Sequence, residues 1–161
     1  MTAPAHVAVG DLIKASYINN LGDFAATVGQ AYTPVLTAAT TDPTLGAGSA
    51  QTGRWRQIGK AVDVDIRIAF GTSGTNAGSG AYFITLPVAG QYNVNFIIGH
   101  GAVGPAGLWT PVKVLYVNGS TVQLRYVSAA VNGAWTTVTN NTPGVFGVSD
   151  EIRLQVAYEA A

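Results

Sequence analysis

The stretch Val62-Asp63-Val64-Asp65-Ile66-Arg67-Ile68-Ala69-Phe70 decides the fold class of this chain. Aliphatic or aromatic residues occupy every second position, and charged residues and one alanine stand between them. Successive side chains of a β-strand point to opposite faces, so this alternation predicts a strand with one face in a core and the other in water. A helix would need apolar residues at steps of three and four instead.

The same alternation of period two recurs toward the C-terminus. Val122, Leu124 and Tyr126 alternate with polar residues, and the last strand repeats the pattern with Ile152, Leu154, Val156 and Tyr158. Many short strands without intervening helices predict an all-β fold, either an antiparallel β-sandwich or a jelly-roll-like barrel. Further strands are expected near 32–38, 53–58, 81–86, 92–98, 108–117, 127–131 and 134–138.

Two Asn-Gly pairs mark the expected hairpin turns of the second half. Asn118-Gly119 and Asn132-Gly133 each stand between two expected strands. Asn and Gly tolerate the positive φ angles of a type I′ turn, so both pairs predict two-residue hairpins. Three longer stretches rich in small and polar residues are expected to be loops at the ends of the sandwich, where binding residues concentrate. These stretches are 71–80, 99–107 and 139–149.

The segment 1–31 differs from the rest, because only here does the chain show helical spacing. Ser16 is suited to cap a short helix and Gly29 to end it, with Ile18, Leu21, Ala25 and Val28 forming its apolar stripe. Such a short helix is marginal alone, so we expect an attachment arm at 1–31 and a β-sandwich domain at 32–161. The candidate attachment residues are Leu12, Ile13, Ile18, Leu21, Phe24 and Val28.

The shortage of charge is the main anomaly of the composition. Charged residues make up 10% of the 161 residues and hydrophobic residues 48%, whereas soluble domains carry about 25% charged residues. Eight basic residues balance eight acidic ones, so the formal net charge is zero. Such a surface favours self-association, and closed symmetry covers it without leaving a growing edge. We therefore expect one domain that forms a cyclic homo-oligomer, with a trimer as the favoured order.

Several partners and cofactors are not expected. The chain lacks the cluster of Lys and Arg that nucleic-acid binding requires. The segment Gly99-His100-Gly101-Ala102-Val103-Gly104 matches the dinucleotide fingerprint, but Pro105 and an expected strand follow where a helix is needed. The sequence therefore predicts no cofactor. It also has no cysteine, and neither a signal peptide nor a segment that inserts into a membrane is expected.

The sequence does not favour an enzyme, and no catalytic residue is assigned. Eight acidic residues leave few carboxylate pairs for glycan hydrolysis. Asp63 and Asp65 share one strand face, but Arg67 stands next to them, so a charged stripe facing solvent or another subunit is the better interpretation. A metal site would need His6 and His100 from distant segments or different subunits, and separate polar side chains are the simpler interpretation.

Three tryptophans are the residues most able to supply binding energy. Core packing and binding are equally compatible with Trp55, whereas core packing is favoured for Trp109 and Trp135. If a surface site exists, Trp109, Trp135 and His100 are its candidate residues, and a host-surface glycan is a possible ligand.

Two segments resemble proteins of one class. The run Tyr32-Thr33-Pro34 through Asp42-Pro43-Thr44-Leu45-Gly46, followed by Gly53-Arg54-Trp55-Arg56-Gln57-Ile58-Gly59-Lys60-Ala61-Val62-Asp63-Val64, resembles a module of phage tail-fibre, minor-tail and head-decoration proteins. Val9-Gly10-Asp11-Leu12-Ile13-Lys14-Ala15-Ser16-Tyr17-Ile18-Asn19-Asn20-Leu21 is similar to the N-terminal arm of many phage surface proteins. The resemblance covers about the first half of the chain. It implies a bacteriophage structural protein made in the host bacterial cytoplasm and located on the virion surface.

Three functions are compatible with these features. They are an externally displayed capsid decoration protein that stabilises the shell, a tail-fibre or minor-tail module that recognises the host surface, and a glycan depolymerase. The depolymerase is the least favoured. A single domain without a coiled coil or a repetitive shaft favours decoration over the tail module. The expected partners are further copies of the chain and virion proteins such as the major capsid protein or tail proteins.

Overall fold

The computed structural model describes residues 29–92, 94–129 and 132–161. The expected helix of the arm and all six candidate attachment residues lie outside these ranges. The described ranges contain no helix long and apolar enough to cross a membrane. Their elements are β1 (Gln30–Tyr32), β2 (Leu36–Ala38), β3 (Ala50–Ile58), β4 (Ala61–Ala69), β5 (Tyr82–Thr85), β6 (Ile97–Gly104), a 3-10 turn (Pro105–Gly107), β7 (Thr110–Asn118), β8 (Thr121–Ser128), β9 (Ala134–Thr137) and β10 (Glu151–Glu159).

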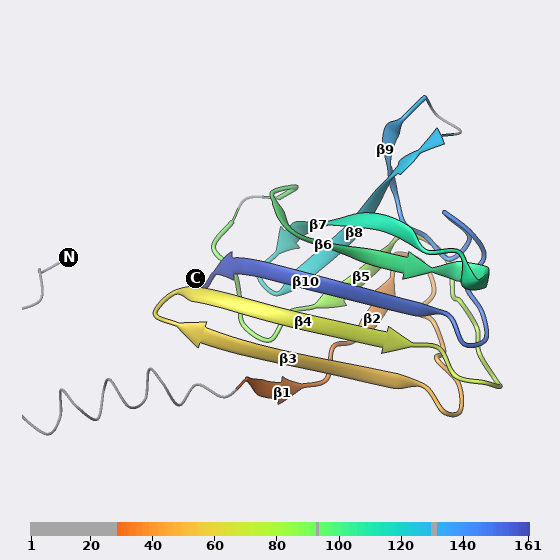
Figure 1. Cartoon of the computed structure of the whole chain (residues 1–161), viewed down its shortest axis with the longest axis horizontal. Coiled ribbons are helices and arrows are strands. Elements are labelled where there is room, and N and C mark those ends of the chain that lie inside the picture. The colour runs from red at the N-terminus through yellow and green to blue at the C-terminus, as the bar shows by residue number, and fades with distance from the viewer. Residues whose placement is uncertain (1–28, 93, 130–131) are drawn as a thin grey trace, which may run out of the picture.

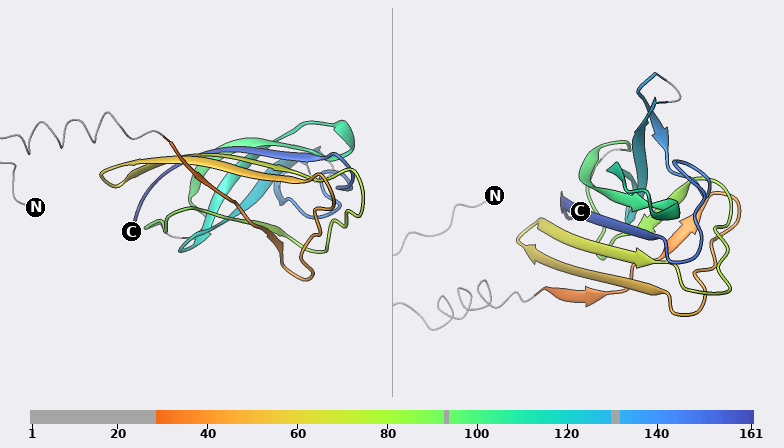
Figure 2. Two further views of the ribbon diagram at one scale, coloured as in Figure 1. Left: turned by 90° about the horizontal axis from the view of Figure 1, so that it is seen from below. Right: turned by 45° about the vertical axis from the view of Figure 1, so that its right-hand side comes forward.

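All ten strands belong to one antiparallel sheet, which confirms the predicted all-β class. The order across the sheet is β1-β3-β4-β10-β6-β7-β8-β5-β2, and β9 pairs with β8 beyond the end of β5. The two outermost strands, β1 and β2, are consecutive in the sequence. The short connection between β1 and β2 therefore links the two edges of the sheet, which curls into a half-barrel (Figures 1 and 2). The opposing layers belong to one continuous sheet rather than to two separate sheets.

The inner face of the curled sheet forms the hydrophobic core. Its alternating positions are those that the sequence predicts: Val62, Val64, Ile66, Ile68, Val122, Leu124, Tyr126, Ile152, Leu154, Val156 and Tyr158 are all buried. Burying each such aliphatic or aromatic side chain contributes about 1.5–3 kcal/mol, so this face supplies the main driving force for folding. The expectation that Asp63, Asp65 and Arg67 face outward is also confirmed.

Two loops that the sequence places at the ends of the domain are anchored at the same end of the sheet. The 71–80 loop pairs with 41–47 through the isolated bridges Thr41 to Ser79, Thr44 to Asn76 and Ala47 to Ser73. The 139–149 loop inserts Phe146 into the core, where its ring contacts those of Phe70 and Tyr82. The N–H of Phe70 donates to the carbonyl of Asp150 at 2.8 Å, which joins the second loop to the end of β4.

The predicted type I′ turn at Asn118-Gly119 is wrong. Asn118 pairs with Thr121, so the turn is centred on Gly119 and Ser120, and neither Asn118 nor Gly119 has a positive φ. A bulge in β7 between Tyr116 and Asn118 shifts the register by one residue and moves the turn with it.

The second predicted two-residue turn is also wrong in length. β8 ends at Ser128, which pairs with Ala134, so five residues connect β8 to β9. Asn132 and Gly133 do have the positive φ angles that their types favour, at 53° and 76°. The Asn-Gly pair therefore indicates the hairpin correctly, while the strand pairing sets the loop length.

The predicted loop at 99–107 is mostly strand, because β6 runs from Ile97 to Gly104. The glycines at 99 and 101, which suggest a loop in the sequence, allow close strand packing instead. A Cβ at Gly99 would lie 2.3 Å from the carbonyl oxygen of Gln155, and one at Gly101 would lie 2.1 Å from that of Arg153. β6 thus approaches β10 more closely than any residue with a side chain permits. The expected strands at 92–98 and 108–117 begin later, at Ile97 and Thr110.

We expect the Gly101→Ala substitution to destabilise the protein by about 3 kcal/mol, because overpacking a well-packed site costs about 1–3 kcal/mol and occasionally more. Gly119→Ala is the matched control, since a Cβ at Gly119 meets no atom within 4 Å. Its effect should stay within about 0.5 kcal/mol. Urea unfolding followed by circular dichroism measures both, and equal midpoints for the two variants would contradict the close approach of β6 to β10.

Candidate binding surface

The outer face of β3, β4, β10 and β6 carries half of the charged residues of the sequence. Four of the eight Lys and Arg residues lie there, namely Arg54, Arg56, Arg67 and Arg153. Four carboxylates accompany them: Asp63, Asp65, Glu151 and Glu159. The predicted charged stripe therefore extends over three neighbouring strands, β3, β4 and β10. With four negative charges against four positive ones, the face has no net charge.

The strand register aligns four polar side chains into a line across this face. Arg54 of β3 pairs with Asp65 of β4, Asp65 pairs with Gln155 of β10, and Gln155 pairs with His100 of β6. All four residues are exposed. We call these four residues the central row. None of them makes a side-chain hydrogen bond or an ion pair with another residue of the described ranges.

The positions on both sides of the central row hold ion pairs. On one side, Nε of Arg56 lies 3.0 Å from Oδ2 of Asp63. On the other side, Glu151 accepts hydrogen bonds from both Arg67 and Arg153, with 2.6 Å between Nη2 of Arg153 and the nearer carboxylate oxygen. The hydrogen bond from Arg67 is the main reason why the pKa of Glu151 lies below its ordinary value. Partial burial opposes that shift, and the hydrogen bond from Arg153 adds to it.

Two hollows open on this face, and the central row separates them. One has a volume of about 660 Å³ and extends toward Ala157 and Gly99, and the other has a volume of about 580 Å³ and extends toward Gly101 and Ala102. The residues that line both hollows are the four members of the central row. Ala102 of β6 and Ala157 of β10 are the outward residues beside the row, and their short side chains leave this space open.

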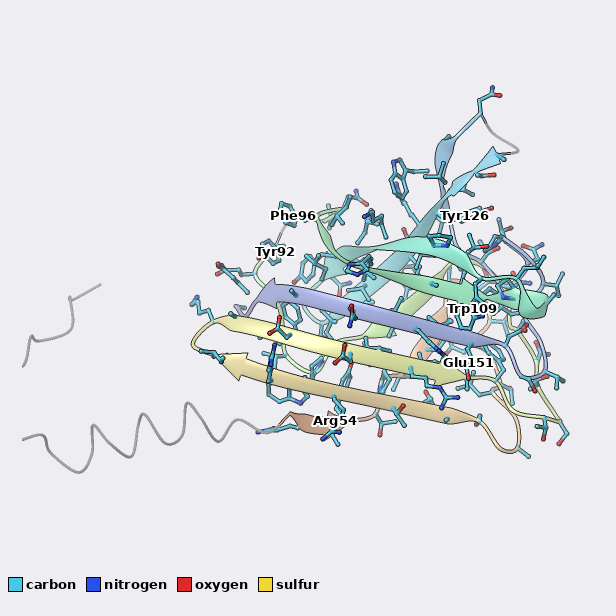
Figure 3. All side chains as sticks on the ribbon, in the orientation of Figure 1. Arg54, Tyr92, Phe96, Trp109, Tyr126 and Glu151 are labelled. Carbon is cyan, nitrogen blue, oxygen red and sulfur yellow. The ribbon has the colours of Figure 1, made fainter. Side chains whose placement is uncertain are left out.

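Trp109 lies at the end of the same face. Its ring atoms lie 3.3 Å from the position that a Cβ of Gly104 would take, so the ring covers this glycine at the end of β6. The guanidinium carbon of Arg153 lies 5.0 Å from the ring centroid, which is a cation–π contact. Figure 3 shows Trp109 beside Glu151 at one end of the sheet face, with Arg54 toward the opposite edge. Trp109 is 51% exposed, so the prediction that it packs in the core is wrong.

The three predicted surface residues do not form one cluster. His100 and Trp109 belong to the face just described, whereas Trp135 lies on β9, beyond β7 and β8 in the sheet order. Trp135 pairs with Val127 of β8, and the two side chains are 49% and 54% exposed. The β8–β9 hairpin that carries them projects from the body of the half-barrel (Figure 1). Core packing is therefore also wrong for Trp135, while Trp55 is half-buried against the core.

A further exposed apolar group lies in the connection that leads into β6. The rings of Tyr92 and Phe96 stack in parallel with their centroids 4.7 Å apart, and Tyr92 also contacts the buried Tyr116 edge to face. Phe96 and Ile97 are exposed, as is Val94 beside them. Figure 3 shows Tyr92 and Phe96 together at the end of the molecule opposite to Trp109.

In the part of the chain that the structure describes, no three His, Cys, Asp or Glu residues come together as a metal site. His6 of the hypothetical histidine pair lies outside that part. Searches against protein-family models, curated proteins and solved structures find no match to this chain.

We expect Glu151→Gln to lower the free energy of unfolding by about 1 kcal/mol at pH 7, because it removes two partly exposed ion pairs. The pKa of Glu151 is lowered in the native state, so its contribution is complete above the ordinary value of 4.5 and is lost as the pH falls through the native pKa. The difference between wild type and variant should therefore shrink on acidification.

Urea unfolding at a series of pH values from neutral to acidic measures this difference. Arg56→Gln is the control, because both members of its ion pair are more than half exposed and its loss should cost less than about 0.5 kcal/mol. A difference between wild type and Glu151→Gln that does not change with pH would contradict the role assigned to Glu151.

Proposed function

We propose that the protein is a structural subunit of a bacteriophage virion, displayed on the outside of the particle as a homo-oligomer that decorates and stabilises the capsid shell. The observation that carries this proposal is the distribution of apolar side chains on the surface. Large hydrophobic side chains are exposed in the connection before β6, on the β8–β9 hairpin and near the end of β6. Charged residues are concentrated elsewhere, on the outer face of β3, β4, β10 and β6.

Exposed apolar groups of this size favour association with other chains. Val127 and Trp135 form a cross-strand pair on a projecting hairpin, so a neighbouring copy is able to bury both side chains at once. Aromatic residues also dominate the energetics of protein interfaces. A closed ring of copies, with a trimer as the favoured order, covers these side chains without leaving a surface for further growth.

The phage assignment is supported by the residues that resemble virion proteins. The second part of that run, 53–64, spans most of β3 and the start of β4, which together form the hairpin between β1 and β10. The resemblance thus includes structural elements of the sheet and not only loops. The arm at its N-terminal end is proposed to attach each subunit to the major capsid protein or to another virion protein. Many weak attachments in one oligomer then act together as avidity.

A tail-fibre or minor-tail module that recognises the host is the second candidate function. The two open hollows on the charged face favour it, because a decoration protein does not require a ligand site on its exposed surface. Both candidates are non-enzymatic and both place the protein on the virion surface.

Native mass spectrometry of the purified protein should show a closed oligomer, with a trimer as the expected mass. The double variant Val127→Ser with Trp135→Ser should shift the protein toward the monomer, because it removes the largest apolar pair on the hairpin. The double variant Lys113→Ser with Gln123→Ser, on the outer faces of β7 and β8, is the control and should retain the wild-type mass. A wild-type monomer at micromolar concentration would contradict the oligomer.

Particles that lack the protein should release their DNA at a lower temperature and adsorb to host cells normally. A subunit that binds only the assembled shell stabilises it by mass action, and the effect increases as the sites are filled. Complementation with the full chain should restore the thermal resistance, whereas a chain without residues 1–28 should not. Unchanged thermal resistance with lost adsorption would overturn decoration and favour the tail module.

A further inference from the structure

The central row differs from the positions on both sides of it. The neighbouring arginines and carboxylates are joined in ion pairs, whereas Arg54, Asp65, Gln155 and His100 make no such contact within the described ranges. These four side chains lie in consecutive register across β3, β4, β10 and β6. Their hydrogen-bonding groups are therefore available to a ligand that lies across the strands.

The spacing of the central row suits an elongated ligand. Neighbouring strands are about 4.8 Å apart, so four residues in register span about 14 Å. The strands hold the Cα positions rigidly, because each member of the row belongs to a ladder of paired residues. A site on strands is better preorganised than one on a mobile loop. The row therefore presents four polar groups at a regular interval along one line.

The chemistry of the row indicates what the ligand is. Arg54 supplies hydrogen-bond donors and Asp65 supplies acceptors. The amide of Gln155 and the imidazole of His100 each offer both donor and acceptor groups. The charges of Arg54 and Asp65 cancel, and the whole face is close to neutral. A polyanion finds no excess of positive charge here, and an apolar peptide segment would leave four polar groups without partners. A neutral compound with many hydroxyl groups matches alternating donors and acceptors, since each hydroxyl acts as both.

The surroundings of the row accommodate the rings of such a compound. Gly101 and Ala102 form an open floor on one side, and Gly99 and Ala157 do so on the other. Arg153 lines the first of these two hollows and packs on the half-exposed ring of Trp109. The exposed part of this indole offers apolar surface to the C–H groups of a sugar. Polar groups thus border the hollow, and an aromatic ring lies beyond it, next to Arg153.

We propose that the central row, with Trp109 beyond the adjoining hollow next to Arg153, is a binding site for a neutral oligosaccharide. The ligand lies across β3, β4, β10 and β6, with its hydroxyl groups bonded to Arg54, Asp65, Gln155 and His100. The site is a property of the folded chain, so the inference does not depend on where the protein is located on a virion.

An array of immobilised neutral di-, tri- and tetrasaccharides, probed with the full-length purified protein, tests the proposal. We expect binding to at least one neutral saccharide, which isothermal titration calorimetry with the free sugar then quantifies. Asp65→Ala and Gln155→Ala should each raise its Kd about tenfold or more, because charged and neutral hydrogen bonds are lost from a preorganised site. Trp109→Ala should raise the Kd for the longer saccharides more than for the disaccharides.

The control is Gln123→Ala, a partly exposed residue of β8 that lies outside both hollows and outside the register of the central row, which should change the Kd less than twofold. Urea unfolding of each variant checks that the sheet is intact. Failure of every neutral saccharide to bind would overturn the proposal, as would binding only to a polyanion such as heparin with steep salt dependence. A change of oligomeric mass in Asp65→Ala or Gln155→Ala would also overturn it, because the row would then be a contact between copies. None of these readouts depends on incorporation into virions.

Discussion

The pairing of β4 with β10 is the interaction on which the rest of the structure depends. The two strands pair over nine residues, from Glu151 opposite Ala69 to Glu159 opposite Ala61. Their inward side chains supply the centre of the core, and their outward side chains supply Asp65 and Gln155 of the central row. Because the period of a strand is two, a slip of one residue would turn both sets to the wrong face. The same register thus fixes the core and the candidate site together.

The glycines of β6 connect the shape of the sheet to its surface. At Gly99 and Gly101 the backbone of β6 approaches β10 so closely that no Cβ fits between the strands. Both glycines pair with buried residues of β10, Val156 and Leu154, so they lie at inward positions of β6, between and beside the outward His100 and Ala102. The close contact of β6 with β10 thus holds His100 in register with Gln155. A substitution at either glycine is expected to disturb that contact.

The sequence predicts the parts of this structure that are governed by local patterns. The alternation in 62–70 and 152–158 identifies the buried faces of β4 and β10, because burial of one face requires it. The strand at 99–104 is not predicted, since glycine-rich segments resemble loops unless the partner strand is known. The type I′ turn predicted at Asn118-Gly119 is wrong because a bulge changes the register. The central row is not visible in the sequence, because its four members come from four strands and meet only through long-range pairing. His100 and Trp109 were candidate surface residues, although core packing was favoured for Trp109, whereas Arg54 and Gln155 were missed.

We propose that the curled sheet is an external subunit of a virion, with its charged face open to the surroundings. A cryo-electron microscopy reconstruction of the intact particle tests this most directly. It should show the half-barrel outside the shell in rings of symmetry-related copies, with the outer face of β3, β4, β10 and β6 exposed to solvent and the β8–β9 hairpins between copies. The account would be contradicted by particles that contain no density for the protein, or by a central row buried against another chain.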